Sequence, residues 1–424
     1  MWIGRKNGKL NYNTMKNTVT ADVPINILII GTGMYVCGRG TDGYGTILPA
    51  IYEWKRQRKI SGNVYIAGAH FEGIETVKEK IKELNKLFGF EIAPRYFTEN
   101  KTYDPEAYRE AIREISRPAC AIVVVPDNLH RKVAGDTIGH GLHTLVVKPL
   151  APTVKEVVDL IELQKKHNVY GAVEFHKRFD LANLKLRDVI KSGVIGDPLY
   201  FIVEYSQRKS IPTERFKGWV ETTNIFQYLG IHYVDIIYFA TKAAPKRVMA
   251  TGQKNWLYSK GINTYDSIGS VVEWEMPNGK RFTSYILTNW IDPETSSAVS
   301  DQKIKVIGTK GRFESDQKKR GIAIVTDEKG IEEPNPYFCS VYGQAGKISY
   351  RGYGIDSIHQ FFNDAIQIEK GLLKVCDLEN ERPTFKQSLV PTKVIEAVNR
   401  SLVENGQWIK TNFIEDRFVG FENI

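Results

Sequence analysis

The stretch INILIIGTG, residues 25–33, decides the fold of this 424-residue chain. Six residues with a high preference for strands end in a Gly-Thr-Gly turn, which is typical of the first βα unit of a dinucleotide-binding sheet. Glycine is favoured in such a turn because the backbone amides must come close to a pyrophosphate. Val36 replaces the third glycine of the usual pattern, and the Gly-rich residues 37–45 lengthen the loop before a helix expected near Ile47. The cofactor-binding residues expected at this turn are Gly31, Thr32, Gly33, Met34 and Tyr35.

The first half of the chain alternates strand-like and helix-like segments, which is the pattern of a parallel α/β sheet. Further strands are expected at residues 64–67, 91–93, 120–125, 144–147 and 169–175. Thr153 and Glu156 form a predicted capping box for a helix that extends through Lys165. Ligands of open α/β sheets bind beyond the carboxyl ends of the strands. We therefore expect cofactor contacts from the residues that follow the strands, namely Pro126, Asp127, Asn128, His130 and Lys148.

The second half of the chain contains strand-like runs in which apolar and polar residues alternate. These runs are residues 198–206, 245–251, 268–274, 281–288 and 302–307, and helices are expected at 184–191, 357–369 and 387–404. The alternation predicts a large, mostly antiparallel sheet with one packed face and one free face. An open apolar face of this kind favours a homodimer or homotetramer.

The predicted organisation has three parts. Residues 1–22 form a flexible leader, and residues 23–177 form an α/β Rossmann domain that binds NAD or NADP. Residues 178–424 form an α+β domain with the large open sheet, which serves substrate binding and oligomerisation.

The composition argues against several other classes of protein. No apolar run approaches the roughly 18 residues of a membrane helix. The N-terminus also lacks the hydrophobic segment of a signal peptide. The four cysteines lack the spacing of a zinc site or a disulfide framework, so no metal is expected and a reducing, cytoplasmic location is favoured. The net charge is +9, but no run of basic residues with interleaved aromatics occurs, which argues against a nucleic-acid partner.

Two side chains suited to binding a hydroxyl and moving its proton stand at defined places in the pattern. Lys148 ends a parallel strand, where it would lie beside a nicotinamide; a surface lysine at a strand end fits the position equally well. His232 lies on an apparent helix over residues 230–239, and Tyr228 shares its face at i−4. A histidine packed against a sheet is the simpler interpretation of His232 taken alone. Asp235, at i+3, either orients that imidazole or caps another group.

The residues that would select the cofactor are missing from their usual place. NAD-binding domains usually carry an acidic residue at the end of the second strand, and NADP-binding domains carry an arginine nearby. Here the strand runs into Gly68-Ala69-His70, and no carboxylate follows before Glu72. Arg39 in the Gly-rich loop is a candidate for a 2′-phosphate, so the choice between NAD and NADP stays open.

Several motifs stand in a fixed order along the chain. They are the glycine turn at 31–33, PDNLH at 126–130, VKPLA at 147–151, RFD at 178–180, SGVIG at 192–196, GIHYVD at 230–235 and IGTKG at 307–311. By these motifs the chain resembles the glucose–fructose oxidoreductase/inositol dehydrogenase family, also written Gfo/Idh/MocA. The resemblance implies a Rossmann domain followed by an open-faced sheet domain, with the active site between them. It also implies NAD(P)-dependent chemistry on a sugar, a polyol or a related hydroxy compound.

The resemblance further implies roles for single residues. Lys148 takes the place of the family's active-site lysine and His232 that of its histidine, whereas Tyr228 stands where many of these dehydrogenases have an aspartate. Val147 replaces the glutamate that usually precedes Lys-Pro. A tyrosine hydroxyl relays a proton if a cation lowers its pKa. The predicted catalytic set is therefore Lys148, His232 and Tyr228.

We expect hydride transfer between NAD(P) and a hydroxyl or carbonyl group of a carbohydrate. Two other functions stay open: a lyase or glycosidase that oxidises its sugar transiently with a tightly bound NAD, and a non-catalytic dinucleotide sensor. A long glycine loop folded over the cofactor would favour the first of these. The candidates for substrate contacts are Arg178, Arg208, Lys209, Arg215, Trp219, Gln227 and His232.

Overall fold

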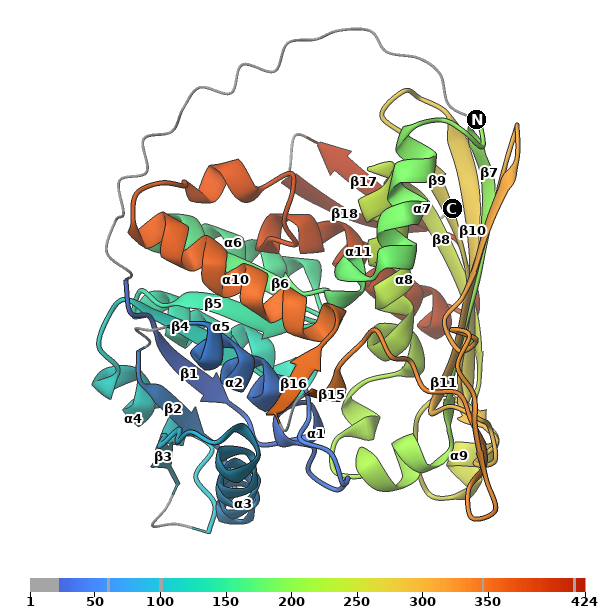
Figure 1. The fold of residues 1–424 in the computed structure, drawn as a ribbon. Coiled ribbons are helices and arrows are strands. Elements are labelled where there is room, and N and C mark those ends of the chain that lie inside the picture. Colours follow the sequence, from blue (N-terminus) through green and yellow to red (C-terminus); the bar gives the residue numbers. More distant parts are fainter. Residues whose placement is uncertain (1–22, 59–61, 99–101, 345–346, 415–416, 424) are drawn as a thin grey trace, which may run out of the picture.

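The computed structural model describes residues 23–58, 62–98, 102–344, 347–414 and 417–423. The predicted leader over residues 1–22 lies outside this part of the chain. A parallel sheet organises the first half of the described residues, and a larger, mixed sheet organises the second half (Figure 1). The predicted fold class is confirmed.

The first sheet has six parallel strands in the order β3-β2-β1-β4-β5-β6, which is the order of a Rossmann domain. The strands are β1 (Asn26–Ile30), β2 (Val64–Ala67), β3 (Arg95–Phe97), β4 (Ala119–Val123), β5 (His143–Val147) and β6 (Gly171–Glu174). The expectation of a strand at residues 91–93 is wrong, because β3 begins only after Pro94. The side-chain amide of Asn85 binds both backbone polar groups of Ile92, at 2.9 and 3.2 Å, so they are not available to a strand ladder.

Helices cover both faces of this sheet because its strands are apolar on both sides. Leu28 enters one core cluster and Ile29 the other. The helices described in this domain are α1 (Met34–Cys37), α2 (Ile47–Gln57), α3 (Phe71–Phe88), α4 (Ala107–Glu114), α5 (His130–Gly139) and α6 (Val154–His167). The predicted capping box of α6 is present, since the Thr153 side chain accepts from the Glu156 backbone and the Glu156 carboxylate accepts from the Thr153 backbone.

The glycine turn leads directly into a short helix, which corrects the expectation of an uninterrupted loop up to Ile47. Helix α1 follows Gly33, and the chain reverses at Gly38, whose φ of 73° lies in the left-handed region. A Cβ at Gly38 would overlap the carbonyl oxygen of Gly43, so this tight reversal requires glycine. The Gly-rich residues that lengthen the loop are therefore placed after one helical turn.

The second sheet has the strand order β12-β11-β7-β10-β9-β8-β17-β18, in which only β7 and β10 pair in parallel. The strands are β7 (Pro198–Arg208), β8 (Ala244–Gln253), β9 (Ser267–Glu275), β10 (Arg281–Asp292), β11 (Ser300–Gly308), β12 (Arg312–Asp316), β17 (Ile409–Ile414) and β18 (Arg417–Asn423). Burial alternates along β9, where Val272 and Trp274 face the core. Leu199 and Leu287 are exposed on the opposite face. The predicted free face is present, and the assembly it would support stays a prediction.

Three helices lie against the packed face of the second sheet, between it and the first domain (Figure 1). They are α7 (Leu181–Lys191), α8 (Ile231–Thr241) and α11 (Phe385–Val403). Helix α10 (Tyr353–Glu369) instead packs on α2 of the first domain, where Phe362 is fully buried. The shorter helical segments are α9 (Trp256–Ser259), 3-10 turns at Asp127–Leu129, His176–Phe179, Val220–Thr222 and Val375–Leu378, and π-helical turns at Ile211–Arg215 and Phe226–Gly230.

A long connection crosses from the second sheet back to the first domain. It leaves β12 and forms the hairpin of β13 (Ile324–Thr326) and β14 (Gly330–Glu332), followed by the hairpin of β15 (Ser340–Gln344) and β16 (Lys347–Arg351). We call residues 317–339 the crossover segment. Cys339 at its end lies 3.7 Å from the carbonyl oxygen of Gly45 in the Gly-rich loop. The crossover segment thus ends against the loop that follows the glycine turn.

Candidate active site

A cleft of about 1450 Å³ lies where the carboxyl ends of the parallel strands face the second domain. It begins at Gly31, passes Lys148 at the end of β5, and reaches Tyr205 on β7 and Gln302 on β11. Small-molecule pockets commonly have volumes of roughly 300–1,000 Å³. The cleft therefore has room for a dinucleotide together with a second small molecule.

The backbone of the glycine turn forms one wall of the cleft. Gly31 has a φ of +124°, and a Cβ on it would overlap the carbonyl oxygen of Val124 at the end of β4. A Cβ on Gly33 would meet nothing within 4 Å. The turn is therefore closed towards the sheet and open towards the cleft, which fits a backbone cradle for a pyrophosphate. The lining residues here are Gly31, Thr32, Gly33, Met34 and Tyr35, and further along the sheet Pro126 and Asp127.

The wall beyond the end of β2 carries aromatic and basic side chains, and the strand itself does not end in a carboxylate. His70 packs on Tyr103 with a ring separation of 4.7 Å, and both line the cleft. Arg39 reaches the start of α3, where it lies 3.8 Å from the exposed carboxylate of Glu72. A dinucleotide bound along the turn would meet these groups at its adenosine end, with one cation and one carboxylate at the same edge.

Lys148 is half-buried in the cleft and held by the backbone of the second domain. Its Nζ donates to the carbonyl oxygen of Tyr228 at 2.6 Å and lies 3.5 Å from the centre of the Tyr228 ring. Burial lowers the pKa of Lys148 to about 8, against the opposing attraction of Asp127 and Glu174. An ammonium of this kind, close to neutrality and facing a ligand cavity, is suited to hold an oxygen and share its proton.

His232 lines the cleft on α8, directly after the π-helical turn Phe226–Gly230. Its Nδ1 is buried and has no hydrogen-bond partner among the described residues. Burial, with the nearby charges of Lys148, His176 and Lys177, lowers the pKa of His232 well below its usual value. The imidazole is therefore neutral at pH 7 and can accept a proton.

A histidine–carboxylate pair that the sequence interpretation missed stands beside His232. The ring of His176 lies 4.9 Å from that of His232, and its Nδ1 is 2.7 Å from a carboxylate oxygen of Glu174. Both residues line the cleft. The rings packed around His176 are those of Tyr35, Phe338 and Tyr353. The signal in the sequence was the spacing Glu-x-His at the end of a predicted strand, which places two polar side chains at the carboxyl edge of the sheet.

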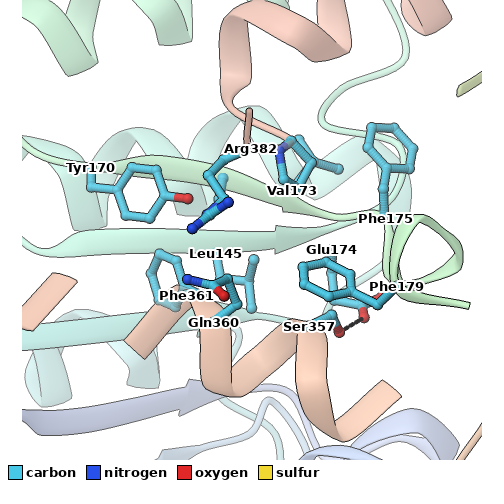
Figure 2. Close-up of a pocket in the computed structure, with 12 residues that line it drawn as sticks. Leu145, Tyr170, Val173, Glu174, Phe175, Phe179, Ser357, Gln360, Phe361 and Arg382 are labelled. Carbon is cyan, nitrogen blue, oxygen red and sulfur yellow. Dashed lines mark hydrogen bonds between the residues drawn. The ribbon is translucent and has the colours of Figure 1, made fainter. Parts of the chain in front are cut away.

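The register of the first sheet explains where this carboxylate comes from. Val147, which replaces the glutamate expected before Lys148, pairs with Glu174 on the neighbouring strand β6. The second oxygen of Glu174 accepts from Ser357 on α10 at 2.7 Å (Figure 2). Behind Glu174 lies a small cavity of about 10 Å³ among Tyr170 and Arg382, at the limit for a single water. The carboxylate that is missing at position 147 is thus supplied by Glu174 on the neighbouring strand.

The second domain contributes polar and aromatic side chains to the far end of the cleft. Of the predicted substrate contacts, Arg208, Arg215, Trp219 and His232 line it. Arg208 donates to the Ser296 carbonyl, and its Nε is buried with no partner among the described residues. Lys177, which the sequence interpretation did not select, is also part of the lining.

Two predicted substrate contacts are corrected because their side chains are committed elsewhere. Arg178 lies outside the described lining of the cleft, where its guanidinium binds both oxygens of Asp235 at 2.6 and 2.9 Å. Asp235 therefore neutralises a buried arginine and does not orient His232. Gln227 also lies outside this lining, and its amide donates to Asp127 at 2.8 Å. Gln227 thereby joins the two domains.

Three further predictions are corrected in the same way. Asn128 is exposed and turned away from the described lining of the cleft. His130 is fully buried with both ring nitrogens on backbone carbonyls, those of Pro149 at 2.6 Å and Val125 at 2.8 Å. Lys209 lies 4.8 Å from the Trp256 ring, outside the described lining. Each residue follows a strand or a turn, as predicted, but its side chain points away from the ligand.

Tyr228 lines the cleft, but its environment does not lower its pKa as expected. Burial and the charge of Asp127 raise the pKa of the Tyr228 hydroxyl, because both disfavour a phenolate. The Lys148 ammonium faces the ring and the backbone carbonyl of Tyr228. Tyr228 thus offers its ring face and its backbone carbonyl to the Lys148 ammonium.

The described residues lack a metal site and a membrane-spanning helix. No group of three or more histidine, cysteine or carboxylate side chains in the described part of the chain is arranged to hold a metal ion. None of the described helices combines the length and the apolar character that crossing a bilayer requires.

Two family models match the chain in order. Residues 55–175 match the model described as an oxidoreductase family with an NAD-binding Rossmann fold, and residues 183–314 match the GFO/IDH/MocA C-terminal domain. Together the two matches cover more than half of the chain.

Sequence relatives and solved structures agree with these matches. The chain is 26% identical over 231 residues to myo-inositol 2-dehydrogenase of Thermotoga maritima, which covers 53% of this chain and 65% of that protein. It is 23% identical over 269 residues to D-glucoside 3-dehydrogenase of Escherichia coli, covering 62% of this chain and 65% of the relative. The chain thus spans less than two thirds of these relatives.

The likeness to solved structures extends over nearly the whole fold. Scyllo-inositol dehydrogenase from Lactobacillus casei, solved with NAD(H) and scyllo-inositol, superposes with a TM-score of 0.61 at 16% identity. The match covers 92% of this chain and 99% of that structure. At this level of identity the likeness shows a shared fold.

Proposed function

Because this chain belongs to the Gfo/Idh/MocA family of NAD-binding oxidoreductases, we propose that it transfers hydride between NAD(P) and a hydroxyl-bearing carbon of a sugar, polyol or sugar derivative. The observation that carries the proposal is the meeting of Lys148, His232 and the His176–Glu174 pair in one cleft. These groups stand at the carboxyl edge of the sheet, next to the glycine turn. They supply an oxygen-binding cation and proton acceptors where a nicotinamide ring would lie.

The cofactor fits the residues that are present. The glycine turn offers backbone amides without an obstructing Cβ, and Pro126, Asp127 and Lys148 continue the lining towards the second domain. Bound NAD(P) supplies the hydride acceptor or donor. The protein side of the reaction is then to hold the substrate oxygen, move its proton and exclude water.

Lys148 holds the substrate oxygen in this proposal. Its ammonium is fixed by the Tyr228 carbonyl, so the side chain does not have to be ordered when the substrate binds. With a pKa of about 8, the ammonium is mostly charged at pH 7 and stabilises an oxygen that is losing its proton.

His232 receives the proton from that oxygen. It is neutral because of its burial and the cations around it, so its imidazole can accept a proton. His176 stands next to it, and its Nδ1 is held by the Glu174 carboxylate. Proton transfer by positioned side chains of this kind contributes roughly 10²- to 10⁴-fold to a rate.

The test is turnover on a panel of sugars, polyols and sugar acids with NAD or NADP, followed by absorbance of the reduced nicotinamide. Lys148→Ala is expected to lower kcat by about 10²- to 10⁴-fold and to change the Kd of the dinucleotide little, because the turn and most of the lining remain. Lys209→Ala is the matched control, since that lysine lies outside the described lining. Unchanged turnover in Lys148→Ala would contradict the proposal.

A lyase or glycosidase with a retained cofactor is the second candidate, and the crossover segment favours it. Asn335, Phe338 and Cys339 of this segment line the cleft, and Cys339 contacts the Gly-rich loop. Arg215 approaches the same loop at Gly40 from the second domain. An enclosed cofactor would be reduced and then reoxidised within one catalytic cycle. Turnover without added dinucleotide is therefore expected of the lyase or glycosidase and not of the dehydrogenase.

A further inference from the structure

Lys177 is a buried cation in the cleft that no carboxylate of the described chain neutralises by contact. Its side chain is 2% exposed. Its Nζ donates to the side-chain oxygens of Gln302 and, at 2.9 Å, of Gln317. The rings of Tyr205 and Tyr233 lie 5.3 and 5.7 Å away. Amide oxygens and ring faces carry only partial charges, so the protonated form of Lys177 has no counter-ion in contact with it.

The acid that acts on the charge of Lys177, Asp180, is already bound to another cation. Asp180 is fully buried, and its carboxylate binds the guanidinium of Arg320 and the amide of Gln317 at 3.0 Å. It also accepts from the backbone of Ala182 at the start of α7, at 3.0 Å. This leaves Lys177 beside a neutralised pair. Burial lowers the pKa of Lys177 to about 7, and the charges of Arg320 and Lys148 act in the same direction.

Burying a charge without a partner is costly. A buried cation on the wall of a ligand cavity is stabilised when the ligand supplies the opposite charge. Two of the three N–H groups of the Lys177 ammonium donate to Gln302 and Gln317, so one is left for a ligand.

We propose that the cleft takes a substrate with a carboxylate group, a polyhydroxy acid, and that Lys177 binds this carboxylate while Lys148 and His232 act on a hydroxyl. The proposal rests on the function proposed above and adds the substrate class. Lys177 makes its contacts to β7, β11 and α8, all in the second domain. It is thereby set apart from the glycine turn on β1, where the phosphates of a dinucleotide would lie.

A carboxylate matches this position better than a phosphate ester does. One ammonium balances one carboxylate, whereas a phosphate dianion next to the same group would bury an extra charge. The amide oxygens of Gln302 and Gln317 would also face that extra negative charge. Sugar phosphates therefore serve as a separate arm of the test.

The test measures Kd by calorimetry on the full chain loaded with NADH. It uses pairs that differ only in the acidic group: D-gluconate with sorbitol, D-glucuronate with D-glucose, and D-galacturonate with D-galactose. Hydrogen bonds to charged groups predict that the acid of at least one pair binds about 10- to 100-fold more tightly. Equal Kd values within every pair, failure of every acid to bind, or tighter binding of glucose 6-phosphate than of all the acids would overturn the proposal.

Variants separate a recognition role from a structural one. Lys177→Met removes the ammonium and keeps an unbranched side chain, so the preference for the acid within the pair is expected to collapse towards one. Lys177→Arg is expected to restore part of that preference, and Lys209→Met to retain all of it. A Lys177→Met protein that binds both members of a pair more weakly by the same factor would show that Lys177 only holds Gln302 and Gln317, and this too would overturn the proposal.

The same samples keep this proposal distinct from the proposed function. Tight binding of an acid without reduction of a dinucleotide contradicts the dehydrogenase and leaves the carboxylate site standing. Turnover of neutral sugars with no preference for acids supports the dehydrogenase and contradicts the carboxylate site.

Discussion

Lys148 and Lys177 are both ammonium groups whose pKa is lowered towards neutral pH, and they are expected to titrate differently when a ligand binds. For both, burial is the largest cause, and the pKa is about 8 for Lys148 and about 7 for Lys177. Lys148 faces the proposed substrate hydroxyl, so its charge matters for neutral and acidic ligands alike. Lys177 faces the proposed carboxylate, so its charge matters only for acids.

The preference for an acid over its neutral partner should therefore fall as the pH rises above 7. Only the charged form of Lys177 binds the carboxylate, and its charged fraction in the free protein drops about fivefold between pH 7 and pH 8. The groups that face Lys177 and share its electrostatics are Lys148, Asp180, Tyr205, His232, Tyr233 and Arg320. Calorimetry at pH 6, 7 and 8 checks the prediction, and the ratio of the two Kd values cancels the titration of Lys148. A ratio that is constant or rises with pH would contradict it.

The pairing of strands decides which residues lie side by side, and the sequence predicts this pairing only in part. The motif of residues 25–33 and the strand ends at Asp127 and Lys148 locate the cleft, because carboxyl ends of parallel strands share one edge. The missing glutamate at Val147 is also visible in the sequence. Its replacement by Glu174 is not, because the pairing of these two residues depends on the register of β5 and β6.

A sequence pattern also does not predict the direction in which a side chain points at the end of a helix or strand. Arg178 and Lys177 are neighbours on one 3-10 turn, yet the first is committed to Asp235 and the second lines the cleft. A one-residue step in such a turn rotates the side chain by about a third of a turn. The prediction selected Arg178 and missed Lys177 for this reason.

The glycine turn is the element whose geometry can be tested most directly by stability. Gly31→Ala places a Cβ against the Val124 carbonyl at a φ of +124°, which is expected to cost about 1–3 kcal/mol and to lower Tm by several degrees. Gly33→Ala is the matched control for stability, since its Cβ meets nothing within 4 Å and its φ is −84°. Thermal unfolding of the two variants checks this, and equal Tm values would show that the turn is not constrained as described.

At the scale of the whole molecule, the two domains are tied together on both sides of the cleft. Buried polar contacts join them on one side, where Gln227 binds Asp127 and Lys148 binds the carbonyl of Tyr228. On the other side the crossover segment runs from β12 to the first domain and ends against Gly45. A dinucleotide along the glycine turn would lie between these two ties.

The crossover segment is therefore expected to slow the release of the dinucleotide, as closing segments do in many enzymes. Phe338 packs on His176 at 5.1 Å and on Tyr353 at 5.2 Å, and it lines the cleft. Phe338→Ala removes this packing and should raise the dissociation rate of NADH by about tenfold or more, for a loss of roughly 1.4 kcal/mol or more in closure. Stopped-flow fluorescence of NADH measures the rate. Ile331→Ala, on the exposed β13–β14 hairpin, is the control. If both variants release NADH at the wild-type rate, the segment is no barrier, and the retained-cofactor alternative loses the observation that favours it.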